Sequence, residues 1–147
     1  SKSCVRVARL FGFDPKVAFL SHSTFGKPIS KNTKHVRDAI EKLKKEKVDF
    51  DFDGEMQPDV ALNPIYQEIY PFSKIVGKAN ILIMPALHSA AISTKLMKVF
   101  GGGKLIGPLL IGLGLPIEVA PLRASTSEIL NLASIASYSS DIIDYSN

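Results

Sequence analysis

The sequence has a single cysteine and no long hydrophobic run. One thiol, that of Cys4, cannot form a disulfide within the chain or build a cysteine metal cluster, which is typical of a reducing compartment. The longest apolar-leaning stretch, residues 105–115, is interrupted by glycines and a proline and is far shorter than the roughly 20 residues of a membrane-spanning helix. Charged side chains interrupt residues 1–20, where a signal peptide would need an apolar run. These absences predict a cytoplasmic protein without a membrane span.

The composition is that of a folded protein. Of the 147 residues, 46% are hydrophobic and 22% are charged, and there are 10 glycines and 9 prolines. These values are near the averages of globular proteins, and a chain of this length buries roughly two thirds of its unfolded surface, enough for one core. We therefore predict a single domain over residues 1–147. The chain starts at Ser1, without an initiator methionine and within a predicted helix, so we expect it to be a piece of a longer protein.

The positive charge is concentrated in the first third of the chain. Residues 1–50 hold 12 Lys and Arg against 5 Asp and Glu, whereas residues 51–147 hold 6 against 9. A basic segment can bind nucleic acid or phosphate-bearing ligands, or it can be a solvated helix face. In residues 31–47 acidic residues are interleaved with the lysines, Glu41 and Lys45 have a favourable helical spacing, and no aromatic residue alternates with the bases. We interpret the segment as a solvated helix face and expect no nucleic-acid partner.

Hydrophobic periodicity predicts alternating strands and helices. Apolar runs of strand length occur at 16–20, 50–52, 80–84, 105–111 and 117–120. Helices are predicted at 5–11, 33–47, 58–70 (broken at Pro64), 88–100 and 127–138, the last capped by Ser125 or Thr126. Strands that are continuous apolar runs are typical of parallel sheets with both faces covered. We predict an α/β fold, a three-layer α/β/α domain with a largely parallel sheet.

Ligands of parallel α/β sheets bind at the carboxyl ends of the strands, so the loops at 21–30, 53–57 and 85–91 are the candidate binding edge. The first loop is rich in hydroxyls, which together with backbone N–H groups could hold a phosphate or acyl oxygen. The alternative is a hydroxyl-rich turn that caps helix 33–47, since the pattern lacks P-loop and dinucleotide spacing. The candidate binding residues of this loop are Ser21, Ser23, Thr24, Gly26 and Lys27.

Two further groups of polar residues follow predicted strands. Asp53, Glu55 and Asp59 could form a metal site or an acid–base pair, but solvated loop charges or helix N-terminal charges are the favoured interpretation. After strand 80–84, His88 could act as a base beside Ser89, and Lys95 could meet a phosphate. Helix capping is the alternative for His88, and the spacing alone favours it. The sequence contains no G-x-S-x-G or H-E-x-x-H motif, so we assign no catalytic residue and no metal ligand.

Several motifs resemble those of the phosphate acetyltransferase/butyryltransferase family in order and spacing. They are DGEMQPDVALNP at 53–64, GKANILIMP at 77–85, Gly101-Gly102, and IGPLLIGL at 106–113. With LSHSTFG at 20–26 and the last helix, they extend the resemblance over residues 12–138. The resemblance implies the isocitrate/isopropylmalate dehydrogenase-like fold of phosphotransacetylases and a homo-oligomer, dimeric or larger.

Within this family, the segment PALHSAAISTK at 85–95 looks most like the C-terminal region of large bacterial NADP-dependent malic enzymes. Those proteins carry a malic enzyme module followed by a phosphotransacetylase-like module. The resemblance implies that this chain is the C-terminal half of the second module. The implied parent oxidatively decarboxylates malate to pyruvate and CO2, with NADP and a divalent metal, Mg or Mn, held by its N-terminal malic enzyme module.

The chain departs from the family's transferases just before the last helix. Those enzymes carry a Ser-Arg-Gly signature, whose serine and arginine are assigned to thiol activation and acetyl-phosphate binding. These positions fall here on Pro121-Leu122-Arg123, and Ala86 stands where many of the transferases have an acid. Because proline has no donor and leucine no charge, we expect no acetyl transfer. Arg123, one position late, stays a candidate ligand-binding residue.

Three functional hypotheses follow from the resemblance. The favoured one is a regulatory and assembly domain that binds acetyl-CoA or a related acyl-CoA and passes inhibition to the malic enzyme module. The second is an active phosphate acetyltransferase, which converts acetyl-CoA and phosphate to acetyl phosphate and CoA. The third is an oligomerisation module without a ligand. The expected ligand-binding residues are Ser21, Ser23, Thr24, Gly26, Lys27, His88, Ser89, Lys95 and Arg123.

Overall fold

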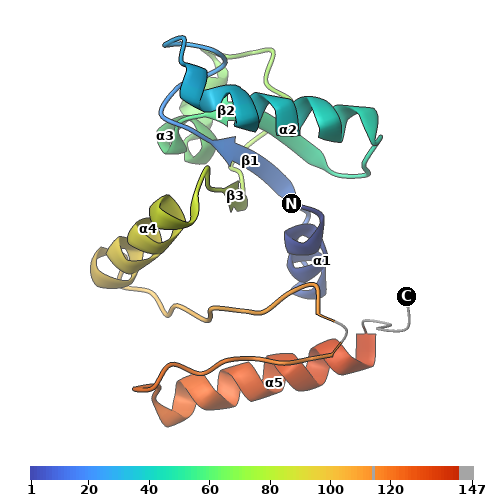
Figure 1. The fold of residues 1–147 in the computed structure, drawn as a ribbon, viewed down its shortest axis with the longest axis vertical. Coiled ribbons are helices and arrows are strands. Elements are labelled where there is room, and N and C mark those ends of the chain that lie inside the picture. Colours follow the sequence, from blue (N-terminus) through green and yellow to red (C-terminus); the bar gives the residue numbers. More distant parts are fainter. Residues whose placement is uncertain (114, 143–147) are drawn as a thin grey trace. The chain divides into compact units, whose positions relative to one another are not determined.

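Three parallel strands form the centre of residues 1–94 in the computed structural model, which describes residues 1–113 and 115–142. The strands β1 (Lys16–Leu20), β2 (Asp51–Met56) and β3 (Ile81–Ile83) are hydrogen-bonded in the order β2-β1-β3 (Figure 1). The apolar sequence of β1 suits its central position, because a parallel strand with both faces covered contacts little solvent. The predicted α/β architecture with a parallel sheet is confirmed.

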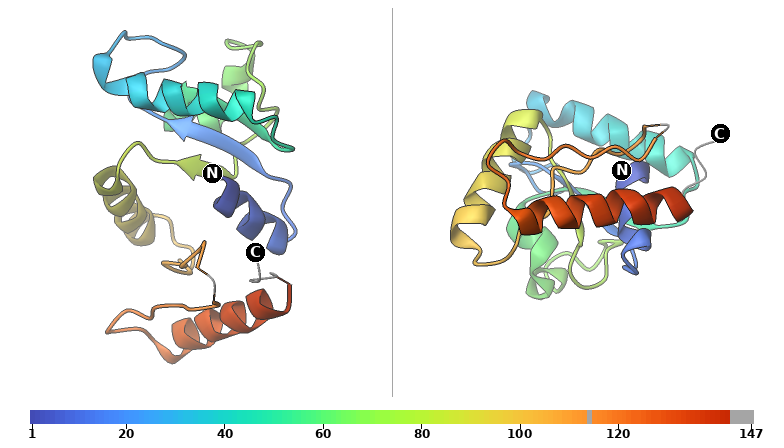
Figure 2. Two further views of the ribbon diagram at one scale, coloured as in Figure 1. Left: turned by 45° about the vertical axis from the view of Figure 1, so that its right-hand side comes forward. Right: turned by 90° about the horizontal axis from the view of Figure 1, so that it is seen from below.

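One face of the sheet is covered by α1 (Lys2–Leu10) and α2 (Lys34–Lys45). Val17 and Phe19 of β1 point to this face and are buried. Figures 1 and 2 both show α2 running beside β1 and β2. Burial of each large aliphatic side chain stabilises the fold by roughly 1.5–3 kcal/mol. The side chains that α2 contributes are the three expected from its periodicity, Val36, Ile40 and Leu43.

The opposite face packs against shorter segments. Ala18 and Leu20 of β1 contact α3 (Pro58–Leu62) and residues 75–79. A short 3-10 helix, η2 (Pro64–Gln67), follows α3, so the expected break at proline is confirmed. Alternate residues of β1 therefore enter two separate apolar clusters, one on each side of the sheet.

Asn80 forms hydrogen bonds that connect the start of β1 to the start of β3. Its Oδ1 accepts a hydrogen bond from the Lys16 backbone N–H at 2.8 Å, and its Nδ2 donates to the Asp14 carbonyl at 2.7 Å. Its own backbone N–H donates to the Lys16 carbonyl at 3.1 Å. Because β3 is short, these bonds extend the contact between the two strands beyond the ladder itself.

The basic helix begins and ends close to its expected bounds. A 3-10 turn, η1 (Lys31–Thr33), leads into α2, and the Ser30 Oγ accepts from the Asn32 N–H at the start of that turn. The helix ends at Lys45, and two residues later Lys47 adopts the left-handed conformation with φ +47°. The ion pair between Lys44 and Glu41, at 2.6 Å, lies on the exposed side of the helix.

The residues form two compact units, 1–94 and 95–147, and the prediction of a single domain stays a prediction. Helix α4 (Leu87–Phe100) crosses the boundary, and α5 (Thr126–Ile142) lies in the second unit. Ser125 caps α5 as expected, since its Oγ accepts from the Glu128 N–H at 3.3 Å and Glu128 Oε2 accepts from the Ser125 N–H at 2.8 Å. Among the described helices, none is both long and apolar enough to cross a membrane.

The strands predicted at 105–111 and 117–120 are wrong. The described part of this segment, 105–113 and 115–120, has irregular backbone. Pro108 has no N–H to donate to a ladder, and Gly107 has a φ of +129°, far from strand geometry. The N–H of Leu110 donates to the carboxylate of Glu118 at 3.0 Å instead of to a neighbouring strand. Apolar content alone is therefore not sufficient to make this segment a strand.

Candidate functional site

The candidate binding loops leave the sheet from the same edge. Phe19, near the end of β1, is paired with Gly54 of β2 and with Ile83 of β3. The next N–H along the chain, that of Ser21, donates to the Met56 carbonyl at 2.9 Å. The hydroxyl-rich loop 21–30 and the segment after β3 therefore start beside each other, as expected for parallel strands.

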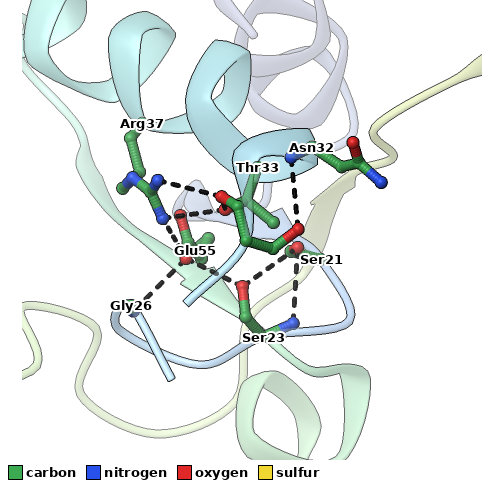
Figure 3. A network of polar contacts seen from close by, with 8 residues as sticks. Ser21, Ser23, Gly26, Asn32, Thr33, Arg37 and Glu55 are labelled. Atoms are coloured by element: carbon green, nitrogen blue, oxygen red, sulfur yellow. Dashed lines mark hydrogen bonds and ion pairs between the residues drawn. The ribbon is translucent and has the colours of Figure 1, made fainter. Parts of the chain in front are cut away.

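A buried carboxylate, that of Glu55, holds the hydroxyl-rich loop (Figure 3). Its side chain is 0% exposed. Oε1 accepts three hydrogen bonds, from Ser23 Oγ at 2.8 Å, from the Gly26 N–H at 3.2 Å and from Arg37 Nη1 at 3.1 Å. The backbone carbonyl of Glu55 accepts another from the Phe25 N–H at 2.7 Å. Three residues of the loop are therefore bonded to one residue of β2.

A break in strand register gives Glu55 this role. Phe19 is paired with Gly54 and Leu20 with Met56, so Glu55 is an extra residue on β2 without a partner on β1. Such a bulge changes the direction of a side chain relative to a regular strand. The bulge thus makes a glutamate available to the loop at the point where the strand ends.

Arg37 reaches the same carboxylate from α2. Its Nη1 also donates to Thr33 Oγ1 at 2.7 Å, and its Nη2 donates to the Ser30 carbonyl at 3.2 Å. A buried carboxylate requires a counter-charge or several donors, and Arg37, whose side chain is 39% exposed, supplies the charge. The second oxygen, Oε2 of Glu55, is buried and has no hydrogen-bond partner within the described part of the chain.

The loop hydroxyls point toward protein groups. Ser23 has one hydroxyl hydrogen, which goes to Glu55, so Ser21 is the donor in the 3.3 Å contact between their oxygens. Thr24 Oγ1 accepts from the Gln57 N–H at 3.2 Å. Ser21, Ser23 and Thr24 are buried, whereas Lys27 is exposed. A role of these residues in ligand binding stays a prediction. In the structure the buried hydroxyls form hydrogen bonds that hold the loop in its conformation.

The tip of the loop is a tight turn with an aromatic residue in it. Thr24 and Lys27 exchange backbone hydrogen bonds of 2.8 and 3.0 Å. The two residues between them, Phe25 and Gly26, have φ values of +47° and +85°, as in a type I′ turn. The Phe25 ring is held from outside the turn, at centroid distances of 5.3 and 4.9 Å from the rings of Tyr70 and Phe72.

The interpretation of the carboxylates after the strand as solvated charges is wrong for two of them. β2 continues to Met56 instead of ending at residue 52, and this places Asp53 and Glu55 inside the strand and buries them. Asp53 accepts from the Lys74 N–H at 2.7 Å through Oδ2. Asp59 is exposed in the first turn of α3, as expected. The described residues contain no group of three His, Cys, Asp or Glu that could hold a metal ion.

Arg37 is not among the residues that the sequence predicts at this edge, and Glu55 is predicted there as one of three carboxylates without its link to the hydroxyl-rich loop. Glu55 stands in the quoted family motif, just after the predicted strand at 50–52, and no local sequence signal indicates its burial. The only signal for Arg37 is its i,i+4 spacing from Thr33 on one face of a helix.

The remaining candidate residues lie after β3 and in the second unit. His88 is exposed in the first turn of α4, and the Ser89 Oγ donates to the Ala86 carbonyl at 3.0 Å. These two residues belong to the same unit as the loop at 21–30. Lys95 and Arg123 are exposed residues of the second unit. Their role in ligand binding also stays a prediction.

The segment before α5 contains Pro121 and Leu122, where the resemblance implies a departure from the transferase signature. Leu122 is fully exposed, and Pro121 accepts a hydrogen bond through its carbonyl from the Ala124 N–H at 2.9 Å. The hydrogen bonds from the backbone and hydroxyl of Ser125 hold the pKa of Glu128 below its ordinary value. A carboxylate of the chain itself thus occupies the N-terminal turn of this helix.

The sequence and fold match one protein family. Residues 1–137 match phosphate acetyl/butaryl transferase. An NADP-dependent malic enzyme of Rhizobium meliloti is 48% identical over 132 residues, which are 90% of this chain and 17% of that protein. A phosphate acetyltransferase of Staphylococcus epidermidis is 38% identical over 135 residues, which are 87% of this chain and 41% of that protein. The chain therefore spans less than half the length of either relative.

Solved structures give the same result. A phosphotransacetylase from Streptococcus pyogenes is 34% identical with a TM-score of 0.87, over 93% of this chain and 42% of that one. The EutD phosphotransacetylase from Staphylococcus aureus is 33% identical with a TM-score of 0.82, over 92% of this chain and 43% of that one. The fold implied by the sequence motifs is confirmed, and the chain belongs to the phosphate acetyl/butaryl transferase family.

Proposed function

We propose that the chain is the regulatory and assembly domain of an NADP-dependent malic enzyme and that it binds acetyl-CoA without transferring the acetyl group. The observation that carries the proposal is the Pro121-Leu122 turn, at the positions of the transferase serine and arginine. Pro121 offers no donor for thiol activation, and the exposed Leu122 offers no charge for acetyl phosphate. The 48% identity to a malic enzyme, against 38% to a phosphate acetyltransferase, supports this parent.

The acyl-CoA would bind at the edge formed by the strand ends. Its phosphates are anionic, and the exposed Lys27 beside the type I′ turn, together with His88 at the start of α4, supplies donors there. The buried hydroxyls would contribute by fixing the loop, because the Ser23 hydrogen is already donated to Glu55. Binding without chemistry requires only such placement, and inhibition requires that the bound form favour a less active state of the parent.

The malate reaction would take place outside this chain. The described residues contain no cluster fit for a divalent cation, and the sequence has no dinucleotide-binding fingerprint. NADP and the Mg or Mn ion would be held by the malic enzyme module. The residues of this chain would bind the acyl-CoA, and this binding would change the activity of that module. Homo-oligomer contacts and contacts with that module are the partners we expect.

The test is a measurement of malate oxidation by the full-length parent protein with and without acetyl-CoA. The same measurement is repeated on a shortened parent protein that ends just before Ser1 and so lacks this chain. We expect inhibition by acetyl-CoA in the full-length protein and none after truncation. Inhibition that survives truncation would assign the sensing to another part of the protein. A full-length protein that oxidises malate but never responds to acetyl-CoA would contradict the regulatory role.

An active phosphate acetyltransferase is the second candidate, favoured by the TM-score of 0.87 to a phosphotransacetylase. It predicts acetyl phosphate formation from acetyl-CoA and phosphate, which a hydroxamate assay measures directly. Our proposal predicts no such product.

The third candidate, an oligomerisation module without a ligand, is favoured by the exposed apolar side chains of α4, such as Leu87 and Phe100. Calorimetric titration with acetyl-CoA separates it from our proposal.

A further inference from the structure

We propose that Glu55 is the positioning residue of the acyl-CoA site, which fixes the turn at 24–27 in its binding conformation. This inference rests on the proposed function, because it names the group on which the affinity of that site depends. Glu55 itself is fully buried and would not touch the ligand. It would act through the loop residues that it holds.

The geometry shows how much of the loop depends on this one residue. The side chain accepts from Ser23 Oγ and from the Gly26 N–H, and the backbone carbonyl accepts from the Phe25 N–H between them. These contacts lie on both sides of the left-handed Phe25, a conformation that an aromatic residue rarely adopts unless its surroundings impose it. Lys27, the exposed cation, follows directly. The bonds to Glu55 thus fix the turn from which the Lys27 side chain extends.

The negative charge of the Glu55 carboxylate is needed to hold the loop, in addition to the size and shape of its side chain. One oxygen, Oε1, accepts three donors. A carboxylate oxygen and an amide oxygen have the same number of lone pairs, but hydrogen bonds to an ionised acceptor are roughly twice as strong as those to a neutral one. A glutamine at this position would therefore hold Ser23, Gly26 and Arg37 less strongly. Its NH2 group would also lie where Oε2 is buried without a partner in the described residues. Glu55→Gln thus loosens the loop with almost no change in volume.

Asp53 provides a matched control. It is a buried carboxylate in the same strand, but its Oδ2 accepts from the Lys74 N–H and it makes no hydrogen bond to the hydroxyl-rich loop. Asp53→Asn removes the same charge at nearly the same place. A general loss of stability from an uncharged residue in β2 would affect both variants, whereas a loss of loop position would affect only Glu55→Gln.

The experiment is calorimetric titration of the full-length protein with acetyl-CoA, with the melting temperature of each variant measured in parallel. We expect Kd to rise about ten-fold or more in Glu55→Gln, because its three donors lose their charged acceptor, and to stay within two-fold of the native value in Asp53→Asn. Ser23→Ala, which removes one of the three donors, should raise Kd by a smaller factor. The effects of Ser23→Ala and Glu55→Gln should combine less than additively, since both break the same contact.

The outcomes separate this inference from the proposed function. Native protein that binds acetyl-CoA, with an unchanged Kd in Glu55→Gln, overturns the positioning role and leaves the regulatory function in place. Equal loss of affinity in Glu55→Gln and Asp53→Asn also overturns it, because the effect is then general. Native protein that does not bind acetyl-CoA overturns both proposals. If Glu55→Gln does not fold, Ser23→Ala decides by the same criterion, with a raised Kd in support and an unchanged Kd against.

Discussion

Lys47 offers a direct test of the backbone conformation at the end of α2. It is exposed, it lies two residues after the last residue of the helix, and its φ is +47°. An L-residue in this left-handed conformation is destabilised by about 1–2 kcal/mol through contact of Cβ with the following carbonyl oxygen. Glycine lacks Cβ and is the residue that most often follows a helix in this conformation. Lys47→Gly should therefore stabilise the fold.

The size of the effect follows from two opposing contributions. Relief of the left-handed conformation contributes about 1–2 kcal/mol, and the greater freedom of glycine in the unfolded chain removes about 0.4–1 kcal/mol. The net increase in the free energy of unfolding should be about 0.5–1 kcal/mol. Because the Lys47 side chain is exposed, its removal takes away little packing.

Lys45 is the matched control, since it is an exposed lysine in the last turn of the same helix. Lys45→Gly removes the same charge from regular helical backbone and should lower the free energy of unfolding by about 1 kcal/mol. Urea unfolding followed by circular dichroism measures both variants. If Lys47→Gly is destabilised as much as Lys45→Gly, then residue 47 does not occupy the left-handed conformation in solution.

Two other contacts lead to predictions that the same measurement can check. Ser125→Ala removes the side-chain cap of α5 and should lower the free energy of unfolding by about 1 kcal/mol. Hydrogen bonds from Ser125 hold the pKa of Glu128 below its ordinary value. The ionised Glu128 therefore stabilises the fold fully above that ordinary pKa, and this stabilisation is lost as the pH falls through the lowered pKa. Ser125→Ala should reduce this dependence of stability on pH. Asn80→Ala removes two hydrogen bonds between the starts of β1 and β3 and should lower the free energy of unfolding by about 1–2 kcal/mol, with faster hydrogen exchange at the Lys16 amide, whereas unchanged exchange there would contradict the contact.

The elements that could be predicted from the sequence are those with a local signal. The apolar run of β1 predicts a strand, and the 3.6-residue spacing of Val36, Ile40 and Leu43 predicts a helix, from the local sequence alone. The segment at 105–120 carries the same kind of apolar signal but forms no strand in its described residues. A strand needs a partner with free N–H and carbonyl groups, and a single apolar run does not reveal whether one is present.

The polar part of β2 could not be predicted for the opposite reason. The sequence of residues 51–55 has acids at alternate positions and a glycine, which is typical of a solvated turn. Its burial depends on a bulge, on the Arg37 guanidinium from the preceding helix and on the Lys74 N–H from a later segment. None of these partners is near in sequence, so the environment that makes Glu55 a buried residue exists only after the chain has folded.

The same network changes what a hydroxyl-rich loop after a parallel strand can do. Serine hydroxyls at such a place favour an anion site when they point outward. Here the hydrogen of Ser23 points to a buried carboxylate, and a phosphate that took this hydrogen would leave two negative charges close together without the donor between them. An anion bound at this loop would therefore have to be held by groups outside this network, such as the exposed Lys27. The conformation of this loop depends on Glu55 and not on Pro121 or Leu122, so the proposed loss of acetyl transfer is compatible with an intact loop.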